Sequence, residues 1–186
     1  LFYSGPIDFT LRLSSNQNIS FENISITRSN GLRNVEIVES DQVSFSNCII
    51  RNTSNLGSNS NVYGLEISSS SNISFTDCGV EAQNTNNWSN SDAHGIVLNT
   101  STSIDFSQCS ISTYAAYGST YTMRVDSSSD VELVENSFYD AANTNNGYGG
   151  RRTMLAMNTV DSALVQDNVF QFGNTLPINS KLVDFD

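Results

Sequence analysis

The stretch SDAHG at residues 91–95 holds the side chains of this sequence that are best suited to acid–base chemistry. His94 is the single histidine among the 186 residues, and Asp92 lies two positions before it. An imidazole serves as a general acid or base because it exchanges its proton close to neutral pH. Arg124 lies about one repeat further along the chain. If the protein is an enzyme, we expect His94, Asp92 and Arg124 to be its catalytic residues.

Two other sets of residues have metal-binding chemistry. Glu36 and Glu66 carry carboxylates of the kind that bind calcium, although such a pair is more often a solvated face, here with Arg12 beside Glu36. One eight-residue pattern with cysteine at its sixth position occurs three times, as VSFSNCII, ISFTDCGV and IDFSQCSI, and it contains Cys48, Cys78 and Cys109. No histidine lies in this frame to complete a zinc site, so we favour buried, apolar cysteines over a metal or redox site. We expect no cofactor and no bound metal, and Glu36 and Glu66 remain the calcium candidates.

Aromatic side chains gather in the connections at 51–64, 81–95, 112–122 and 139–154. Tyrosine and tryptophan combine a flat apolar face with a polar group, which suits a sugar ring. The expected ligand-binding residues are Tyr63, Trp88, Tyr117, Tyr121, Tyr148 and Arg151. The pair Arg151–Arg152 follows NNGYGG and suits an acidic sugar, but a solvated loop is the favoured interpretation.

One rigid spacing of apolar residues recurs six times, at offsets 0, 2, 8, 10, 13 and 15 from a first residue. The copies begin at Leu11, Val35, Leu65, Ile96, Met123 and Leu155. Apolar pairs two residues apart indicate three short strands in each copy. The two-residue bend after offset 10 ends in Asn, Asp, Gln or Glu, and Asn and Asp tolerate the left-handed conformation that tight corners need. Successive copies start 24, 30, 31, 27 and 32 residues apart, so one connection varies in length.

A constant frame with one variable connection predicts an all-β solenoid in which equivalent residues stack in ladders. The pattern resembles the right-handed parallel β-helix of the pectate-lyase-like superfamily over roughly residues 10–171. We expect about six three-stranded coils in a single domain, 1–186, with the frame over 11–170 and partial end coils at 1–10 and 171–186. Even offsets are expected to face inward, which would stack His94, at offset −2, between Tyr63 and Tyr121.

The resemblance is less informative about activity. The letters AHG resemble the Gly-His-Gly of polygalacturonases, but the Asn-Thr-Asp, Asp-Asp and Arg-Ile-Lys motifs of those enzymes are missing. The Arg-x-x-Pro of pectate lyases is missing as well, and the Asp-Pro-His-Asp of alginate epimerases matches at Asp92 and His94 alone.

Composition bears on partners and location. A net charge of −11 disfavours nucleic acid, and no apolar run is long enough to insert into a membrane. Six Asn-x-Ser/Thr sequons indicate an extracellular or cell-surface protein. Uncapped ends predict end-to-end self-association or a place in a longer β-helix.

We therefore expect an exported structural or adhesive module that forms filaments or lies on a cell surface, with glycans bound by its loops. The first alternative is a lyase, hydrolase or epimerase acting on acidic polysaccharides. The second is a segment of a phage or viral fibre.

Overall fold

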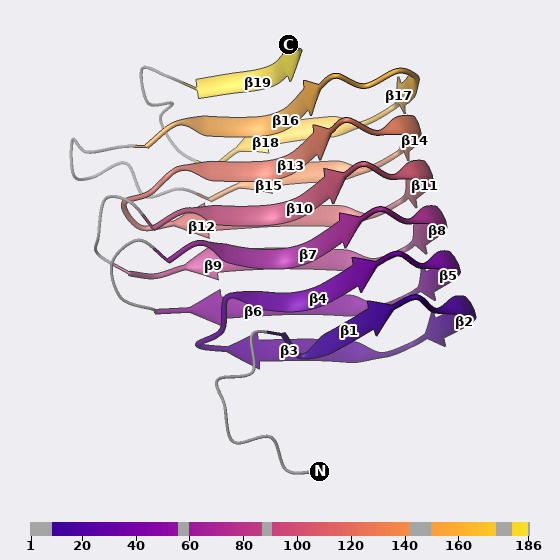
Figure 1. Cartoon of the computed structure of the whole chain (residues 1–186). Coiled ribbons are helices and arrows are strands. Elements are labelled where there is room, and N and C mark those ends of the chain that lie inside the picture. Colours follow the sequence, from indigo (N-terminus) through magenta and orange to yellow (C-terminus); the bar gives the residue numbers. More distant parts are fainter. Residues whose placement is uncertain (1–8, 56–59, 87–90, 142–149, 174–179, 186) are drawn as a thin grey trace.

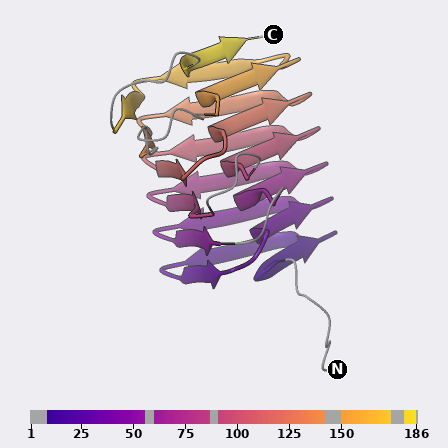
Figure 2. The same cartoon turned by 90° about the vertical axis from the view of Figure 1, so that its left-hand side faces the viewer.

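The chain folds as an all-β parallel solenoid with three sheets. The computed structural model describes residues 9–55, 60–86, 91–141, 150–173 and 180–185, and within these residues there is no helix. Consecutive strands belong to sheets A, B and C in turn, and each strand pairs with the equivalent strands of the coils before and after it. Figure 1 shows the layers rising from β1 to β19, and Figure 2 shows the same stack from the side.

The described strands divide into one sheet of seven and two of six. Sheet A consists of β1 (Leu11–Ser14), β4 (Arg33–Val38), β7 (Val62–Ser68), β10 (Ala93–Asn99), β13 (Thr120–Asp126), β16 (Arg152–Asn158) and β19 (Ser180–Phe185). Sheet B consists of β2 (Gln17–Glu22), β5 (Asp41–Ser46), β8 (Ser71–Thr76), β11 (Thr102–Ser107), β14 (Ser129–Val134) and β17 (Ala163–Gln166). Sheet C consists of β3 (Ser25–Ser29), β6 (Ile49–Ser54), β9 (Gly79–Asn84), β12 (Ser110–Ala115), β15 (Ser137–Asp140) and β18 (Val169–Phe172).

Strand pairing follows the apolar frame position by position. The first frame residues Leu65, Ile96 and Met123 are direct neighbours across β7, β10 and β13. In sheet B the phenyl rings of Phe21, Phe45, Phe75 and Phe106 stack in turn, with centroids 4.6, 4.8 and 4.8 Å apart. The predicted ladders are therefore confirmed, and they form the core between the sheets.

The two-residue bend between sheets B and C turns through a left-handed residue in each copy. The φ angle is 49° at Asn47 and 54° at Asp77, and the equivalent residues Asn23, Gln108, Glu135 and Asp167 lie between 55° and 56°. The prediction from residue type is confirmed at this corner.

The bend between sheets A and B is held by a ladder of buried serines. Each serine hydroxyl donates to the carbonyl two residues earlier, as Ser70 Oγ does to Ser68 O at 2.8 Å. The same oxygen accepts the backbone N–H of the serine one coil before, as Ser70 Oγ does from Ser40 N at 3.1 Å. Equivalent bonds continue through Ser101 and Ser128. Because each serine satisfies backbone groups in two coils, the length of this bend is fixed.

The alternation of inward and outward residues breaks near the start of the sheet A strands, and this break decides what the outer face presents. A Cβ placed on Gly95 would point at Ile111 and Thr113 of sheet C, inside the solenoid, and Ile96 is also fully buried in the core. Two consecutive residues therefore face inward, so His94, just before them, lies on the outer face. The expectation that offset −2 faces inward is wrong for this reason.

The described residues contain no apolar helix of membrane-spanning length.

Candidate functional site

The outer face of sheet A brings the candidate catalytic residues into two neighbouring rows. One row holds Tyr63, His94 and Tyr121, which are direct neighbours across β7, β10 and β13. The second row holds Glu66, Val97 and Arg124 in the same register. Asp92 precedes β10, in the connection that leads to this face.

His94 is the middle ring of an aromatic stack. Its imidazole lies 4.8 Å from the ring of Tyr63 and 5.1 Å from that of Tyr121, with interplanar angles of 13° and 6°. The predicted stacking between two tyrosines is confirmed, although it occurs on the outer face. The other neighbour of the Tyr63 ring is the Arg33 guanidinium, 5.4 Å from the centroid. The Tyr63 ring, which was expected to bind a sugar, therefore faces the side chains of His94 and Arg33.

Burial makes His94 a weak base. The side chain is 6% exposed, and neither ring nitrogen has a hydrogen-bond partner. Desolvation, with a smaller contribution from the charge of Arg124, lowers the pKa of His94 to about 4. The imidazole is consequently neutral at pH 7 and closed to solvent, which does not suit it to exchange protons with a substrate.

Asp92 and Arg124 each have a partner other than His94. The Asp92 carboxylate accepts the backbone N–H of Ser119 at 2.7 Å, and burial raises its pKa. Arg124 Nε lies 2.7 Å from a carboxylate oxygen of Asp126 on its own strand. Within the described residues no hydrogen bond links Asp92, His94 and Arg124 into a catalytic set.

The two calcium candidates are adjacent, as predicted, but each is held by an arginine. Glu36 and Glu66 are direct neighbours across β4 and β7. Arg12 Nε lies 3.0 Å from Glu36, and Arg33 Nε bonds Glu66. In the described part of the chain no group of three or more His, Cys, Asp or Glu side chains is placed to hold a metal ion.

The loop candidates are spread along the solenoid. Trp88 and Tyr148 lie outside the described residues. Tyr117 is half-buried in the connection between β12 and β13. Arg151 forms an ion pair with Asp184 of β19, which also pairs with Lys181. Arg151 therefore fastens β19 to the connection before β16.

Arg152 contradicts the interpretation of Arg151–Arg152 as a solvated loop. It is 1% exposed and begins β16 inside the solenoid. Its Nη1 atom lies 3.7 Å from the Asp140 carboxylate and 3.5 Å from the Thr120 hydroxyl, which itself donates to Asp140 at 2.5 Å. The one available signal was position, since Arg152 occupies the strand slot that Ala93 and Thr120 fill in neighbouring coils.

The cysteines form a buried ladder and no disulfide. Cys48, Cys78 and Cys109 are all free thiols. Each sulfur bonds a backbone carbonyl two residues earlier, at 3.2 to 3.3 Å. Burial raises the pKa of Cys48, which keeps that thiol protonated. The favoured expectation of buried, apolar cysteines is consistent with these contacts.

Asparagines continue the cysteine ladder with backbone bonds. Asn136 Oδ1 accepts the backbone N–H of Cys109 at 2.8 Å, and its Nδ2 donates to Phe106 O at 2.8 Å. Asn168 repeats both bonds one coil later.

A different asparagine, Asn52, belongs to a sequon, but it is fully buried and donates to Tyr63 O at 2.9 Å, so it is closed to glycosylation.

Comparisons with known proteins leave the family open. No family model matches the chain, and no curated protein matches it. One similar solved structure is a trypsin-treated form of QnrB1, a plasmid-mediated fluoroquinolone resistance protein, at 16% identity over 93% of this chain and 91% of that one, with a TM-score of 0.20. Another is the surface protein and adhesin PfbA of Streptococcus pneumoniae, at 10% identity over 94% and 68%, with a TM-score of 0.24. Likeness at such TM-scores supports no inference about this chain, so the fold assignment rests on its own strand pairing.

Proposed function

We propose that the protein is an exported structural module, a section of β-helical rod that lies on a cell surface or in a filament. The observation that carries this proposal is that each candidate catalytic group is used by the scaffold. His94 is the centre of a ring stack, Asp92 holds a backbone amide of the next connection, and Arg124 pairs within its own strand. Groups held in this way by neighbouring side chains and backbone are poorly placed to act on a substrate.

Contacts between coils on two outer faces support a structural role. On sheet A the pairs Arg12–Glu36 and Arg33–Glu66 each join one coil to the next. On sheet C, Arg51 and Glu81 do the same at 2.5 Å. Exposed ion pairs contribute little singly, at about 0–1 kcal/mol each. Repeated along a solenoid, they favour a rod whose coils stay in register.

The end of the solenoid near β17 supports joining to a further coil. Val165 is a frame residue on β17, and Val169 on β18 follows the frame residue Asn168; both are exposed. Phe185 on β19 is 69% exposed. Apolar side chains and strand edges exposed together are a site for strand addition. We propose that a further β-helical coil covers this end, supplied by the same chain in a longer helix or by a second copy.

Three finer assignments belong to the same proposal. We infer a right-handed helix of about six coils, similar to the pectate-lyase-like superfamily, and the six frame copies and their register support it. Glycan binding by the loops is supported by Tyr117, a half-buried aromatic side chain in the connection between β12 and β13. Activity on acidic polysaccharides, with His94, Asp92 and Arg124 in a cleft, and a place in a phage or viral fibre remain the competing functions.

An activity screen separates the structural module from the enzyme. The protein is incubated with polygalacturonate and with alginate, and new reducing ends and unsaturated products are measured. We expect neither. Product release by the natural chain that is lost in His94→Ala, but kept in the control Arg12→Ala on the same face, would establish the enzyme instead.

Electron microscopy with mass measurement in solution tests the joining of coils. We expect end-to-end fibres or higher oligomers that grow with concentration. Stable monomers at high concentration would exclude the filament and leave the longer single helix as the source of the covering coil.

A further inference from the structure

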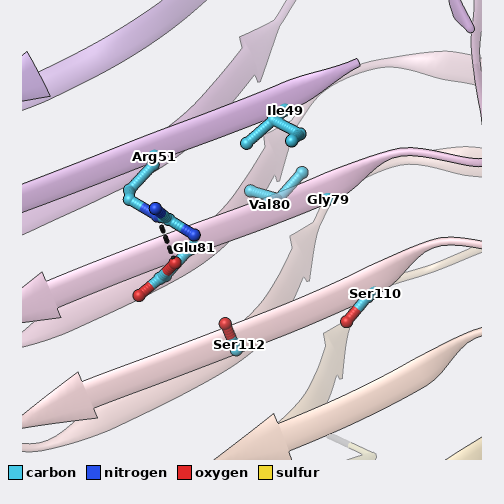
Figure 3. A pocket seen from close by; sticks show the side chains of 7 residues that line it. All are labelled: Ile49, Arg51, Gly79, Val80, Glu81, Ser110 and Ser112. Carbon is cyan, nitrogen blue, oxygen red and sulfur yellow. Dashed lines mark hydrogen bonds and ion pairs between the residues drawn. The ribbon is translucent and has the colours of Figure 1, made fainter. Parts of the chain in front are cut away.

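A hollow of about 190 Å³ opens on the outer face of sheet C, away from the sheet A face and the loops discussed above. Figure 3 shows it lying across β6, β9 and β12, with side chains from all three strands around it. The strand register places six of its seven lining residues in two rows, Ile49, Gly79 and Ser110 in the first and Arg51, Glu81 and Ser112 in the second, and the seventh is the buried Val80.

Gly79 makes the hollow, and the fold does not require a glycine there. A Cβ placed on Gly79 would meet no atom within 4 Å, and its φ lies outside the left-handed region. Gly64 and Gly95 differ, because a Cβ there would come within 2.8 and 2.4 Å of backbone oxygens. Glycine in a strand loses conformational freedom and packs nothing, and it often marks a place where a ligand approaches the backbone. Packing explains Gly64 and Gly95, whereas Gly79 is left without a structural reason.

The walls around Gly79 combine one apolar side chain with polar groups. Ile49, one coil before, is 49% exposed and offers a bare aliphatic surface. Ser110, one coil after, places a hydroxyl that can both donate and accept. Along the second row the Arg51 Nε atom donates to Glu81 Oε2 at 2.5 Å. The two terminal amino groups of a guanidinium bonded through Nε remain potential donors.

The charge of this surface is balanced. Glu81 receives Arg51 at one carboxylate oxygen and Gln83 at the other. The carboxylate is therefore neutralised by its neighbours and holds the arginine in place. With a net charge of −11, the whole chain repels polyanions. A ligand without charge suits the hollow better than an acidic one.

We propose that the hollow at Gly79 binds one ring of a neutral saccharide. Its volume is smaller than that of the pockets of about 300 Å³ or more that hold drug-sized ligands. A single pyranose ring is of this size. Its carbon-bound hydrogens would lie against Ile49, and its hydroxyls would bond Ser110, Ser112 and Arg51. This site is independent of the proposed structural role and of the aromatic loop residues.

Amide-resolved NMR titration tests the site with defined probes. The protein is titrated with glucose, galactose, mannose and N-acetylglucosamine up to the solubility of each, with galacturonate as the acidic comparison. We expect at least one neutral sugar to cause saturable shifts at the amides of Ile49, Gly79 and Ser110. No saturable shift there with any of the four neutral sugars overturns the proposal. Tighter binding of galacturonate than of galactose overturns it as well.

Gly79→Thr adds a side chain in the hollow, where a Cβ would meet no atom within 4 Å, and it is the matched variant. We expect it to weaken sugar binding at least tenfold and to leave the thermal midpoint unchanged or raised. Ser74→Thr adds a methyl group on the outer face of sheet B and should bind as the natural protein does. The double variant Ser110→Ala with Ser112→Ala removes the hydroxyls and should also weaken binding. Undiminished affinity in a folded Gly79→Thr protein refutes the site.

Discussion

The phenylalanine ladder of sheet B allows the energy of one ring–ring contact to be isolated. Phe75 is fully buried and stacks on two rings, those of Phe45 and Phe106, with centroids 4.8 Å away on both sides. Phe138 in sheet C is also fully buried but stacks on the single ring of Phe170, at 4.8 Å. Replacing either phenylalanine by leucine removes a similar amount of buried surface. Phe75→Leu removes two ring pairs, whereas Phe138→Leu removes one.

Leucine is a suitable replacement because the ladder already accommodates it. Leu133 is the direct neighbour of Phe106 in the next coil and is fully buried. An aromatic pair contributes about 0.5–1.5 kcal/mol beyond the burial of its area. We therefore expect Phe75→Leu to lower the free energy of unfolding by about 1 kcal/mol more than Phe138→Leu does.

Urea-induced unfolding followed by circular dichroism measures this difference. The comparison requires equal denaturant dependence in both variants, since a changed slope signals a change in cooperativity. Phe21→Leu, at the end of the ladder with one ring neighbour and partial exposure, should cost the least. Equal costs for Phe75→Leu and Phe138→Leu would refute the idea that ring stacking, apart from burial, stabilises the ladder.

Three further outcomes follow from the same contacts. The pKa of His94 is about 4 in the folded chain, against an ordinary value of 6.5 for an exposed imidazole, so the unfolded chain takes up the proton first as the pH falls. The free energy of unfolding should therefore fall by about 3 kcal/mol as the pH drops from 6.5 to 4. Unfolding curves of His94→Tyr should lack this dependence. Asn136→Ala leaves the backbone amide of Cys109 without its acceptor and should cost about 1–3 kcal/mol in urea unfolding, and no loss would mean that water replaces the amide. Gly95→Ala should lower the thermal midpoint sharply, because its Cβ would come within 2.4 Å of a backbone oxygen, while Gly79→Ala should not.

The ladders could be predicted from the sequence because they depend on spacing alone. Every coil must repeat the same inward positions to stack, so an apolar frame with one elastic connection determines which residues are neighbours. The pairing of Leu65 with Ile96 and the left-handed corner at Asn47 follow directly from this frame. Both features are local or nearest-neighbour properties.

The candidate site was harder to predict because it depends on where strict alternation fails. The position before the first frame residue is buried whether it holds Gly64, Gly95 or Thr122, so two residues in a row face inward and the row of His94 lies on the outer face. Glycines inside the strand were a signal for this break in alternation in two coils only, those of Gly64 and Gly95. Arg152 was misinterpreted because its partner Asp140 lies on another sheet, and no periodicity in the sequence reveals a single buried pair.

The serine ladder gives the molecule a polarity. Ser40, Ser70 and Ser101 each donate their backbone N–H to the serine hydroxyl of the following coil, and the last acceptor is Ser128. The bond dipoles all point the same way, so they add along the axis and polarise one another. The two ends of the solenoid are consequently different surfaces, because the ladder runs in one direction along the axis. Any assembly that extends this ladder must add its units in one orientation, which excludes head-to-head pairing and favours directional growth.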